Sequence, residues 1–406
     1  MKKRLPVVLT LTLLTLAQLA HIQIKFLPAA LMGLVAESSG LSITAVGMVI
    51  SACTVASGLS PLAASLVIDR FGGTAAMAAS ALLTALAGLL PNLSESFPVL
   101  MAAYILCGAG IGFSFCATPV LIARWISPDF RTLALSVSFA LYSAFTSLAY
   151  FLPGYMVSAS GNWRAPLPAW ALVSLVCAAG LAALCRAEPK SAPRAPAGPS
   201  GAAGLGRAAR VPSVLVLTLV MTCFIWVNNT YSTYLPNFLE RVRAADVHQS
   251  GFITSMSFLC GIFGCLLSGA LETRCHRLML YGFPVLALLG GVGLGLSSRF
   301  WVLALCSGLF GFAYQGWIPQ AYAIFMRDPR MDAGTLGGAA ALFDGVGHIL
   351  TLLIPAAYAG LIAAAGMARV MLITSAGLLL PFALQLAFRR ALSPVPAGPD
   401  ASAERD

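Results

Sequence analysis

Long apolar stretches, separated by short polar segments, follow one another along almost the whole chain. Most are about 20 residues or longer, the length at which an α-helix crosses the hydrocarbon core of a bilayer. The alternating pattern of a membrane β-barrel, with segments of roughly ten residues, is absent. The pattern therefore predicts an all-α integral membrane protein with twelve transmembrane helices. The predicted spans are 5–34, 43–66, 75–90, 98–123, 132–157, 166–185, 213–239, 249–268, 278–297, 300–326, 335–361 and 366–388.

Composition narrows the class of protein further. Of the 406 residues 59% are hydrophobic and 9% are charged, whereas soluble domains are about 25% charged. The net charge of +10 forms no basic stripe among aromatic residues, so no nucleic-acid partner is predicted. The ten cysteines lie mostly in apolar runs and are interpreted as packing residues, without metal-ligand spacing. No nucleophile–base pair or phosphate loop is present, so we expect no enzyme, no catalytic residue, no cofactor and no metal.

The distribution of basic residues predicts the orientation. An even number of spans places both termini on one side, and eighteen of the 24 Lys and Arg residues fall on that side against five on the other. The positive-inside rule then predicts a multi-pass inner-membrane protein with cytoplasmic termini. A cleaved signal peptide over 1–20 is the alternative, but Gln18 occupies the −3 position, where a small residue is required.

The chain reads as two copies of one unit. A stretch rich in Ala, Pro, Gly and Arg, residues 186–212, has no apolar periodicity and predicts a flexible cytoplasmic linker. It separates two pseudo-symmetric six-helix bundles, 1–185 and 213–390, followed by a cytoplasmic tail, 391–406. Residues of the two halves correspond at shifts between about 200 and 208. The correspondences are Leu27-Pro28 with Leu235-Pro236, Gly108 and Pro119 with Gly308 and Pro319, and Pro153 with Pro355. Such repeats are typical of secondary transporters whose site lies between the halves.

One loop identifies the family that the chain resembles. After the second span, Asp69, Arg70 and Gly72 match the core of the loop signature G-x-x-x-D-R-x-G-R-K of the major facilitator superfamily, which the chain departs from at Ser65 and Gly73. With twelve spans and a central linker, the whole chain resembles this family, which implies its two-bundle fold and a loop that latches the cytoplasmic side. The gating residues that the resemblance implies are Asp69, Arg70, Gly72, Arg131, Glu272 and Arg274. The basic residue in the first span, the stretch Gly108-Ala-Gly-Ile-Gly112 and the stretch Tyr234-Leu-Pro-Asn-Phe238 also resemble the cyanate/2-nitroimidazole transporter-like branch.

Few ionisable side chains lie within the spans, and such residues are functional candidates. His21 and Lys25 stand four residues apart in the first span, as do Asp344 and His348 in the eleventh, so each pair shares a helix face. Lys25 could balance an anionic cargo, pair with Asp344, or extend to the outer headgroups. Asp344 is predicted to couple transport to protons, the alternative being a purely structural partner. His348 could simply bond a neighbouring carbonyl.

Polar and aromatic residues of the fifth, seventh and tenth spans complete the candidate pocket. Unsatisfied amides are costly in hydrocarbon, which favours a role for Asn228 and Asn229. The predicted substrate-binding residues are His21, Lys25, Tyr142, Asn228, Asn229, Tyr231, Tyr314, Gln315, Asp344 and His348.

The function predicted from these features is secondary active transport of a small organic solute, favoured to be an anion, by alternating access and with proton coupling. The expected partners are the solute, membrane lipid and a proton or other coupling ion, and one chain should suffice as a monomer. Two alternatives stay open. One is efflux of lipophilic, cationic or metallophore-like compounds; the other is a transporter-shaped membrane sensor without flux.

Overall fold

The computed structural model describes residues 4–126, 128–158, 160–187, 201–328, 331 and 333–392, which contain helices and no strand. The first half holds α1 (Arg4–Ala30), α2 (Met32–Ser39), α3 (Ile43–Leu59), α4 (Pro61–Phe71), α5 (Gly73–Leu89), η1 (Leu90–Asn92), α6 (Phe97–Trp125), α7 (Pro128–Ser158) and α8 (Leu167–Ala187). The second half holds α9 (Gly201–Ala208), α10 (Pro212–Arg243), α11 (Val247–Leu296), α12 (Phe300–Arg327), α13 (Ala333–Leu350), η2 (Thr351–Leu353), α14 (Ile354–Ala365), α15 (Met367–Ala376) and α16 (Leu379–Ala387).

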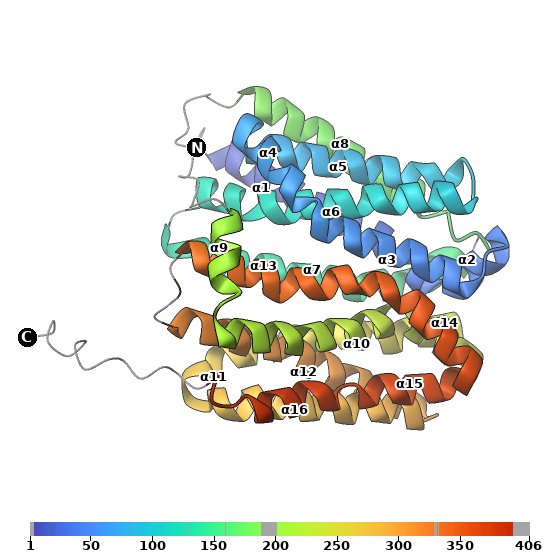
Figure 1. Cartoon of the computed structure of the whole chain (residues 1–406). Helices are drawn as coiled ribbons and strands as arrows, with labels where there is room; N and C mark the ends of the chain where they lie inside the picture. Colours follow the sequence, from blue (N-terminus) through green and yellow to red (C-terminus); the bar gives the residue numbers. More distant parts are fainter. Residues whose placement is uncertain are drawn as a thin grey trace, which may run out of the picture.

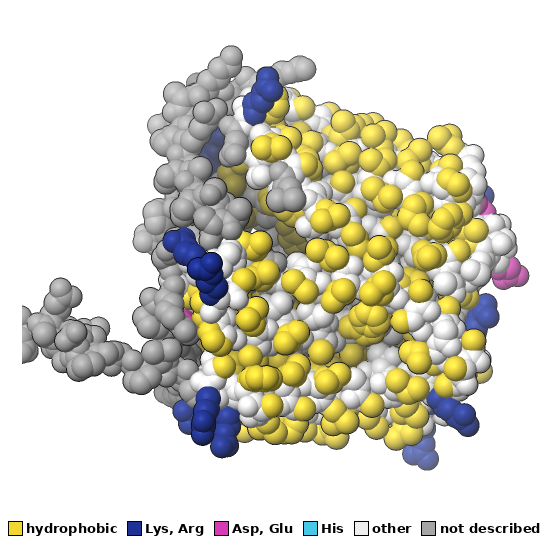
Figure 2. Space-filling view, in the orientation of Figure 1, with side chains coloured by type: hydrophobic (Ala, Val, Ile, Leu, Met, Phe, Trp, Pro, Cys, Tyr) yellow, Lys and Arg dark blue, Asp and Glu magenta, His cyan; other side chains and the backbone are white. Residues whose placement is uncertain are grey.

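The predicted membrane architecture is confirmed. Within the part of the chain that the structure describes, eleven helices are long and apolar enough to cross a membrane, and a twelfth span results when the bent pair α2 and α3 is counted as one. The single helix α11 contains two of the predicted spans, which meet at the non-helical residue Cys275. Figure 2 shows a broad face of hydrophobic and uncharged groups, with Lys and Arg confined to its two ends, as a membrane-embedded surface requires.

The two ends of the bundle differ in how the halves meet. We call the end where α1 begins, α16 ends and α9 lies the linker end, and the opposite one the distal end (Figure 1). At the linker end the first half has a hydrophobic core of its own, which includes Leu13, Met77 and Leu121. At the distal end one core joins both halves, and there Tyr234 and Phe258 of the second half pack among first-half residues. The halves are therefore packed together distally.

Several predicted spans are interrupted in the structure, either near a proline or at a glycine. The first run ends as a straight helix at Ala30, just after Pro28, and α2 then meets α3 at 114°. The eleventh run is split by η2, and Pro355 stands in the first turn of α14. Pro355 accounts for the second break, because proline cannot donate the helical hydrogen bond. The bend between α2 and α3 contains no proline, and α2 ends there at Gly40 in the left-handed conformation with a φ of 66°.

The stretch predicted as an unstructured linker contains a helix. Residues 188–200 lie outside the described residues, but Gly201–Ala208 forms α9, which packs against α13. Ala208 and Val211 are buried in the core of the second half. This end of the linker is therefore fixed to the second half. The sequence did not predict this, because the apolar side chains of the segment are too few to form a periodic pattern and are buried only by packing against the second half.

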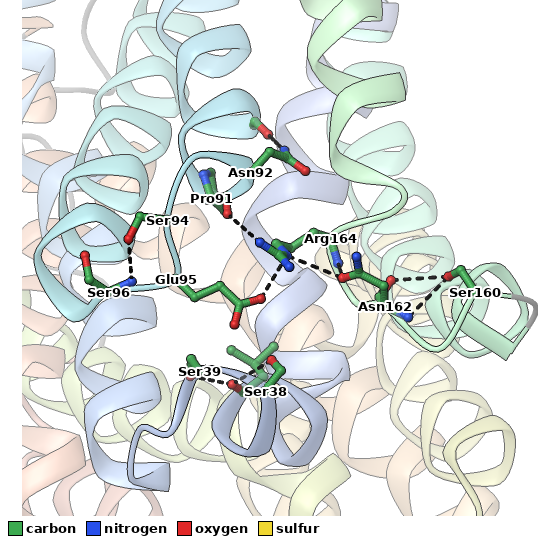
Figure 3. A network of polar contacts seen from close by, with 12 residues as sticks. Ser38, Ser39, Pro91, Asn92, Ser94, Glu95, Ser96, Ser160, Asn162 and Arg164 are labelled. Carbon is green, nitrogen blue, oxygen red and sulfur yellow. Dashed lines mark hydrogen bonds and ion pairs between the residues drawn. The ribbon is translucent and has the colours of Figure 1, made fainter.

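A polar network ties the distal loops of the first half together (Figure 3). Arg164 Nε lies 2.8 Å from Glu95 Oε1, and its guanidinium also donates to the Pro91 carbonyl at 3.5 Å. Asn162 Oδ1 accepts from the Arg164 backbone N–H at 3.0 Å. The loop before α6 is thus joined to the loop between α7 and α8.

We expect Arg164→Ala to lower the free energy of unfolding by about 1 kcal/mol, because the ion pair is only partly shielded from solvent. Thermal melts of Arg164→Ala, Glu95→Gln and the double variant measure the coupling. The prediction is contradicted if removal of Arg164 costs as much in the Glu95→Gln background as in the parent protein.

Candidate functional site

One face of α1 carries three polar side chains into the bundle. Gln18, His21 and Lys25 follow one another at helical spacing, and each is at most 9% exposed. Pro28 lies in the last turn of the same helix. The polar face therefore runs through the membrane-embedded part of the first half.

Lys25 lies where four helices of the first half converge. Its ammonium interacts with Cys53 of α3, Cys107 of α6 and Tyr142 of α7, and it stands 4.9 Å from the centre of the Phe26 ring. Among the side chains that the structure describes, no carboxylate lies within ion-pairing distance of it. Extension to the outer headgroups does not fit this burial. Lys25 is a cation inside the bundle with neutral neighbours.

His21 and Gln18 each keep one polar atom without a partner. The Nδ1 atom of His21 has no hydrogen bond, although the Cys107 thiol donates to its backbone carbonyl at 3.8 Å. Gln18 Nε2 donates to Thr118 Oγ1 at 3.1 Å and to Ser138 Oγ at 3.4 Å, whereas its Oε1 is unpartnered. Buried polar atoms of this kind require an explanation, since most are satisfied in folded proteins.

An aromatic layer closes the site on its distal side. The ring of Tyr150 stacks on Phe258 at 5.5 Å and packs against Phe26 at 5.4 Å, which joins α1 and α7 of the first half to α11 of the second. The Tyr150 hydroxyl also donates to the Ser232 carbonyl of α10. Since Phe26 adjoins Lys25, the layer separates the ammonium from the distal end.

The predicted residues of α10 and α12 lie mainly within the second half. Asn229 Nδ2 donates to the Ile225 carbonyl of its own helix at 3.0 Å, and the neighbouring Asn228 is half-buried. The Tyr231 hydroxyl lies 2.6 Å from Ser375 Oγ. Tyr314 packs near the rings of Phe224 and Phe310, and Gln315 lies against Gly261. None of the contacts described for Tyr231, Tyr314 and Gln315 is with Lys25.

The remaining candidates lie near the contact between halves or in the loops. His348 is half-buried on α13 and faces Gly58 of α3. Arg70 is exposed over the Phe71 ring, and Gly72 forms the turn into α5 with a φ of 91°. Five side chains lie outside the described ones, and their roles stay predictions. They are Asp69, Arg131, Glu272, Arg274 and Asp344.

Sequence reasoning did not find every neighbour of the site. Cys53 and Cys107 lie beside Lys25 but were interpreted as packing residues, and the aromatic layer went unnoticed. The sequence around these residues does not indicate their role, because most residues within the membrane spans are apolar.

Comparison with known proteins decides the family. A model described as Major Facilitator Superfamily matches residues 13–352. The chain belongs to the major facilitator superfamily. It is therefore a membrane transporter and not an enzyme, as the sequence predicted.

The relatives and neighbours of this major facilitator superfamily member are distant. It is 23% identical over 259 residues to the probable sulfoacetate transporter SauU of Cupriavidus necator, covering 60% of each chain. It is 26% identical over 210 residues to the mouse (Mus musculus) glucose-6-phosphate exchanger SLC37A1, covering 47% of this chain and only 38% of that one. The matches thus span about half the length of these curated relatives.

Solved structures confirm the fold. A bacterial homolog to the human lysosomal transporter Spinster, inward-facing and unoccupied, superimposes with a TM-score of 0.80 at 15% identity, covering 97% of this chain and 99% of that one. The nucleoside transporter NupG superimposes with a TM-score of 0.74 at 14% identity, covering 94% and 100%.

Proposed function

We propose that this transporter carries a small organic anion whose charged group binds Lys25. The observation that carries the proposal is the burial of this ammonium among neutral groups from four helices. A buried charge without a counter-charge costs several kcal/mol, so a membrane protein retains one where a ligand supplies the opposite charge. No described side chain supplies the opposite charge, and Asp344 lies outside the described ones, so we assign the role of counter-ion to the solute.

The printed names of the two curated relatives support this substrate class. Sulfoacetate and glucose 6-phosphate are both organic anions, although their anionic groups differ. Each carries an anionic group of the kind that a buried cation can bind, although sulfoacetate carries two such groups, a sulfonate and a carboxylate. The solute itself does not follow from these names, because the matches cover only part of each relative.

The transport cycle proposed here is alternating access. The joint hydrophobic core and the aromatic layer lie on the distal side of Lys25, so in the proposed cycle the solute would reach Lys25 from the linker end in this state. We place the linker end in the cytoplasm of the inner membrane on the basis of the Lys and Arg distribution. Rocking of the two halves would open the distal end, and one chain contains the whole pathway. Asp344 stays the predicted proton-coupling residue.

The test is ligand-induced stabilisation of the purified protein. Melting temperatures are measured with small sulfonates, carboxylates, sugar phosphates and lipophilic cations, for the parent chain, Lys25→Met and the charge-preserving Lys25→Arg. An anion present at 100 times its Kd should stabilise the parent protein by about 2.7 kcal/mol. This effect should vanish in Lys25→Met and persist in part in Lys25→Arg. Stabilisation by cations alone, or by anions equally in Lys25→Met, would reject the proposal.

A further inference from the structure

The polar face of α1 continues beyond Lys25 toward the linker end, where α1 packs against both α6 and α7. Gln18 binds a hydroxyl on each wall, Thr118 on α6 and Ser138 on α7. His21 lies between Gln18 and Lys25 on the same helix face, so the three side chains form one line. We call these residues, Gln18, His21, Thr118 and Ser138, the α1 slot.

The slot contains unused hydrogen-bonding capacity on nine-tenths-buried side chains. Gln18 is 6% exposed and has one end of its amide bonded, while the other has no partner. His21 is 2% exposed, and its Nδ1 is also unpartnered. Leaving such a group unpaired costs about 1–3 kcal/mol. Two such groups on one helix face, next to the proposed anion site, point to a ligand that pairs with them.

The slot has an exposed edge. The ring of Tyr142, the neighbour of Lys25, packs at a tilt against Phe115 of α6, with the ring centres 5.6 Å apart. Phe115 stands one turn before Thr118, and its side chain is 45% exposed. The α6 side of the slot thus reaches the surface at Phe115.

Charge decides which group the slot can hold. Lys25 is the cation on this helix face, and none of the four slot residues carries a permanent charge. None of these four residues could supply a counter-ion to a second anionic group placed among the amide, the imidazole and the two hydroxyls. A neutral hydroxyl or amide could donate to the free end of Gln18 and accept from its surroundings. The slot therefore suits a neutral polar group.

We infer that the α1 slot is a second subsite, which binds a neutral hydrogen-bonding group of a solute whose anionic end is held by Lys25. The substrate class is then a hydroxylated or amidated monoacid, not a plain fatty acid and not a diacid. His21 lies about 6 Å and Gln18 about 10 Å from Lys25 along the helix axis, so the two ends of the solute are separated by a distance of this order. The inference rests on the proposed function, since it takes Lys25 as the anion site.

The experiment measures the separation of the two subsites with ligands of increasing chain length. Affinities for the full chain are measured by titration calorimetry with ω-hydroxy acids from 3-hydroxypropionate to 8-hydroxyoctanoate, with the plain acids of equal length, and with the corresponding diacids. At one chain length the hydroxy acid should bind about tenfold more tightly than the plain acid, as expected for one well-paired hydrogen bond. The diacid should bind more weakly than the hydroxy acid.

Gln18→Met and the isosteric Thr118→Val test the subsite without removing the anion site. In Gln18→Met the advantage of the hydroxy acid should fall to about one, while the affinity for the plain acid stays unchanged, which also shows that the variant is folded. Thr118→Val should reduce the advantage in part. The inference is overturned if no chain length gives an advantage above about twofold, if Gln18→Met retains it, or if the diacid binds best. If instead none of the acids binds, or Lys25→Met binds plain acids normally, the proposed function itself fails.

Discussion

Replacement of Gly251 by valine is expected to reduce transport at least tenfold while both halves remain folded. Gly251 of α11 lies against the backbone carbonyl of Tyr150 on α7, and any Cβ at this position would overlap that oxygen. The same helices are joined one turn away, where Ser147 Oγ donates to the Ser255 carbonyl at 3.1 Å. A side chain here must therefore separate the two halves at the distal end.

The size of the effect follows from the cost of overpacking, typically 1–3 kcal/mol. In the proposed cycle this contact is made only in the distally closed state, so the cost would shift the population away from that state. Uptake into proteoliposomes measures transport, and hydrogen exchange of peptides covering 145–155 reports opening. Gly269→Val on the same helix is the matched control, because its Cβ would meet nothing within 4 Å. Normal transport by Gly251→Val would show that the halves can close without this contact.

Gly311→Val is expected to prevent folding of the second half. A Cβ at Gly311 of α12 would overlap the backbone of Ser257 on α11, including its carbonyl oxygen. Both helices belong to the same half, so no movement of the transport cycle relieves this clash. The destabilisation should exceed about 3 kcal/mol, at the upper end for overpacked cores.

Size-exclusion chromatography of detergent extracts checks this prediction, since the variant should yield little monodisperse protein. Gly360→Val on α14 is the control, because its Cβ would meet nothing within 4 Å. A monodisperse Gly311→Val protein with a parent-like melting temperature would contradict it. The two glycine variants together separate contacts within a half from contacts between halves.

The position of the spans could be predicted because each depends on local hydrophobicity alone. Burial of Lys25 was one of the predicted alternatives for the same reason, because a cation within an apolar run must either be buried in the bundle or extend to the headgroups. What could not be predicted is the rotation of each helix about its axis. Tyr231 looks from sequence like a pocket residue, yet its hydroxyl lies 2.6 Å from Ser375 Oγ, 144 positions along the chain. Only the packing of α10 against α15 decides which way this ring points.

The neighbours of Lys25 were missed for a related reason. Cys53 and Cys107 come from different helices and lie together only after α3 and α6 have packed. Phe26, Tyr150 and Phe258 likewise join three helices from two halves. A pattern along the sequence gives the spacing of residues within one helix. It does not show which side chains of another helix lie opposite them.

The aromatic layer at Phe26, Tyr150 and Phe258 has an electrical consequence. Each elementary charge that crosses a bilayer polarised at 100 mV dissipates about 2.3 kcal/mol. A file of water past Lys25 would let protons and small ions run down this voltage during every cycle, whether or not solute moved. The three rings offer little polar surface to such a file, because the one hydroxyl among them, on Tyr150, is bonded to the Ser232 carbonyl. In the proposed cycle, the layer would therefore maintain the voltage across the membrane while Lys25 is open to the opposite side.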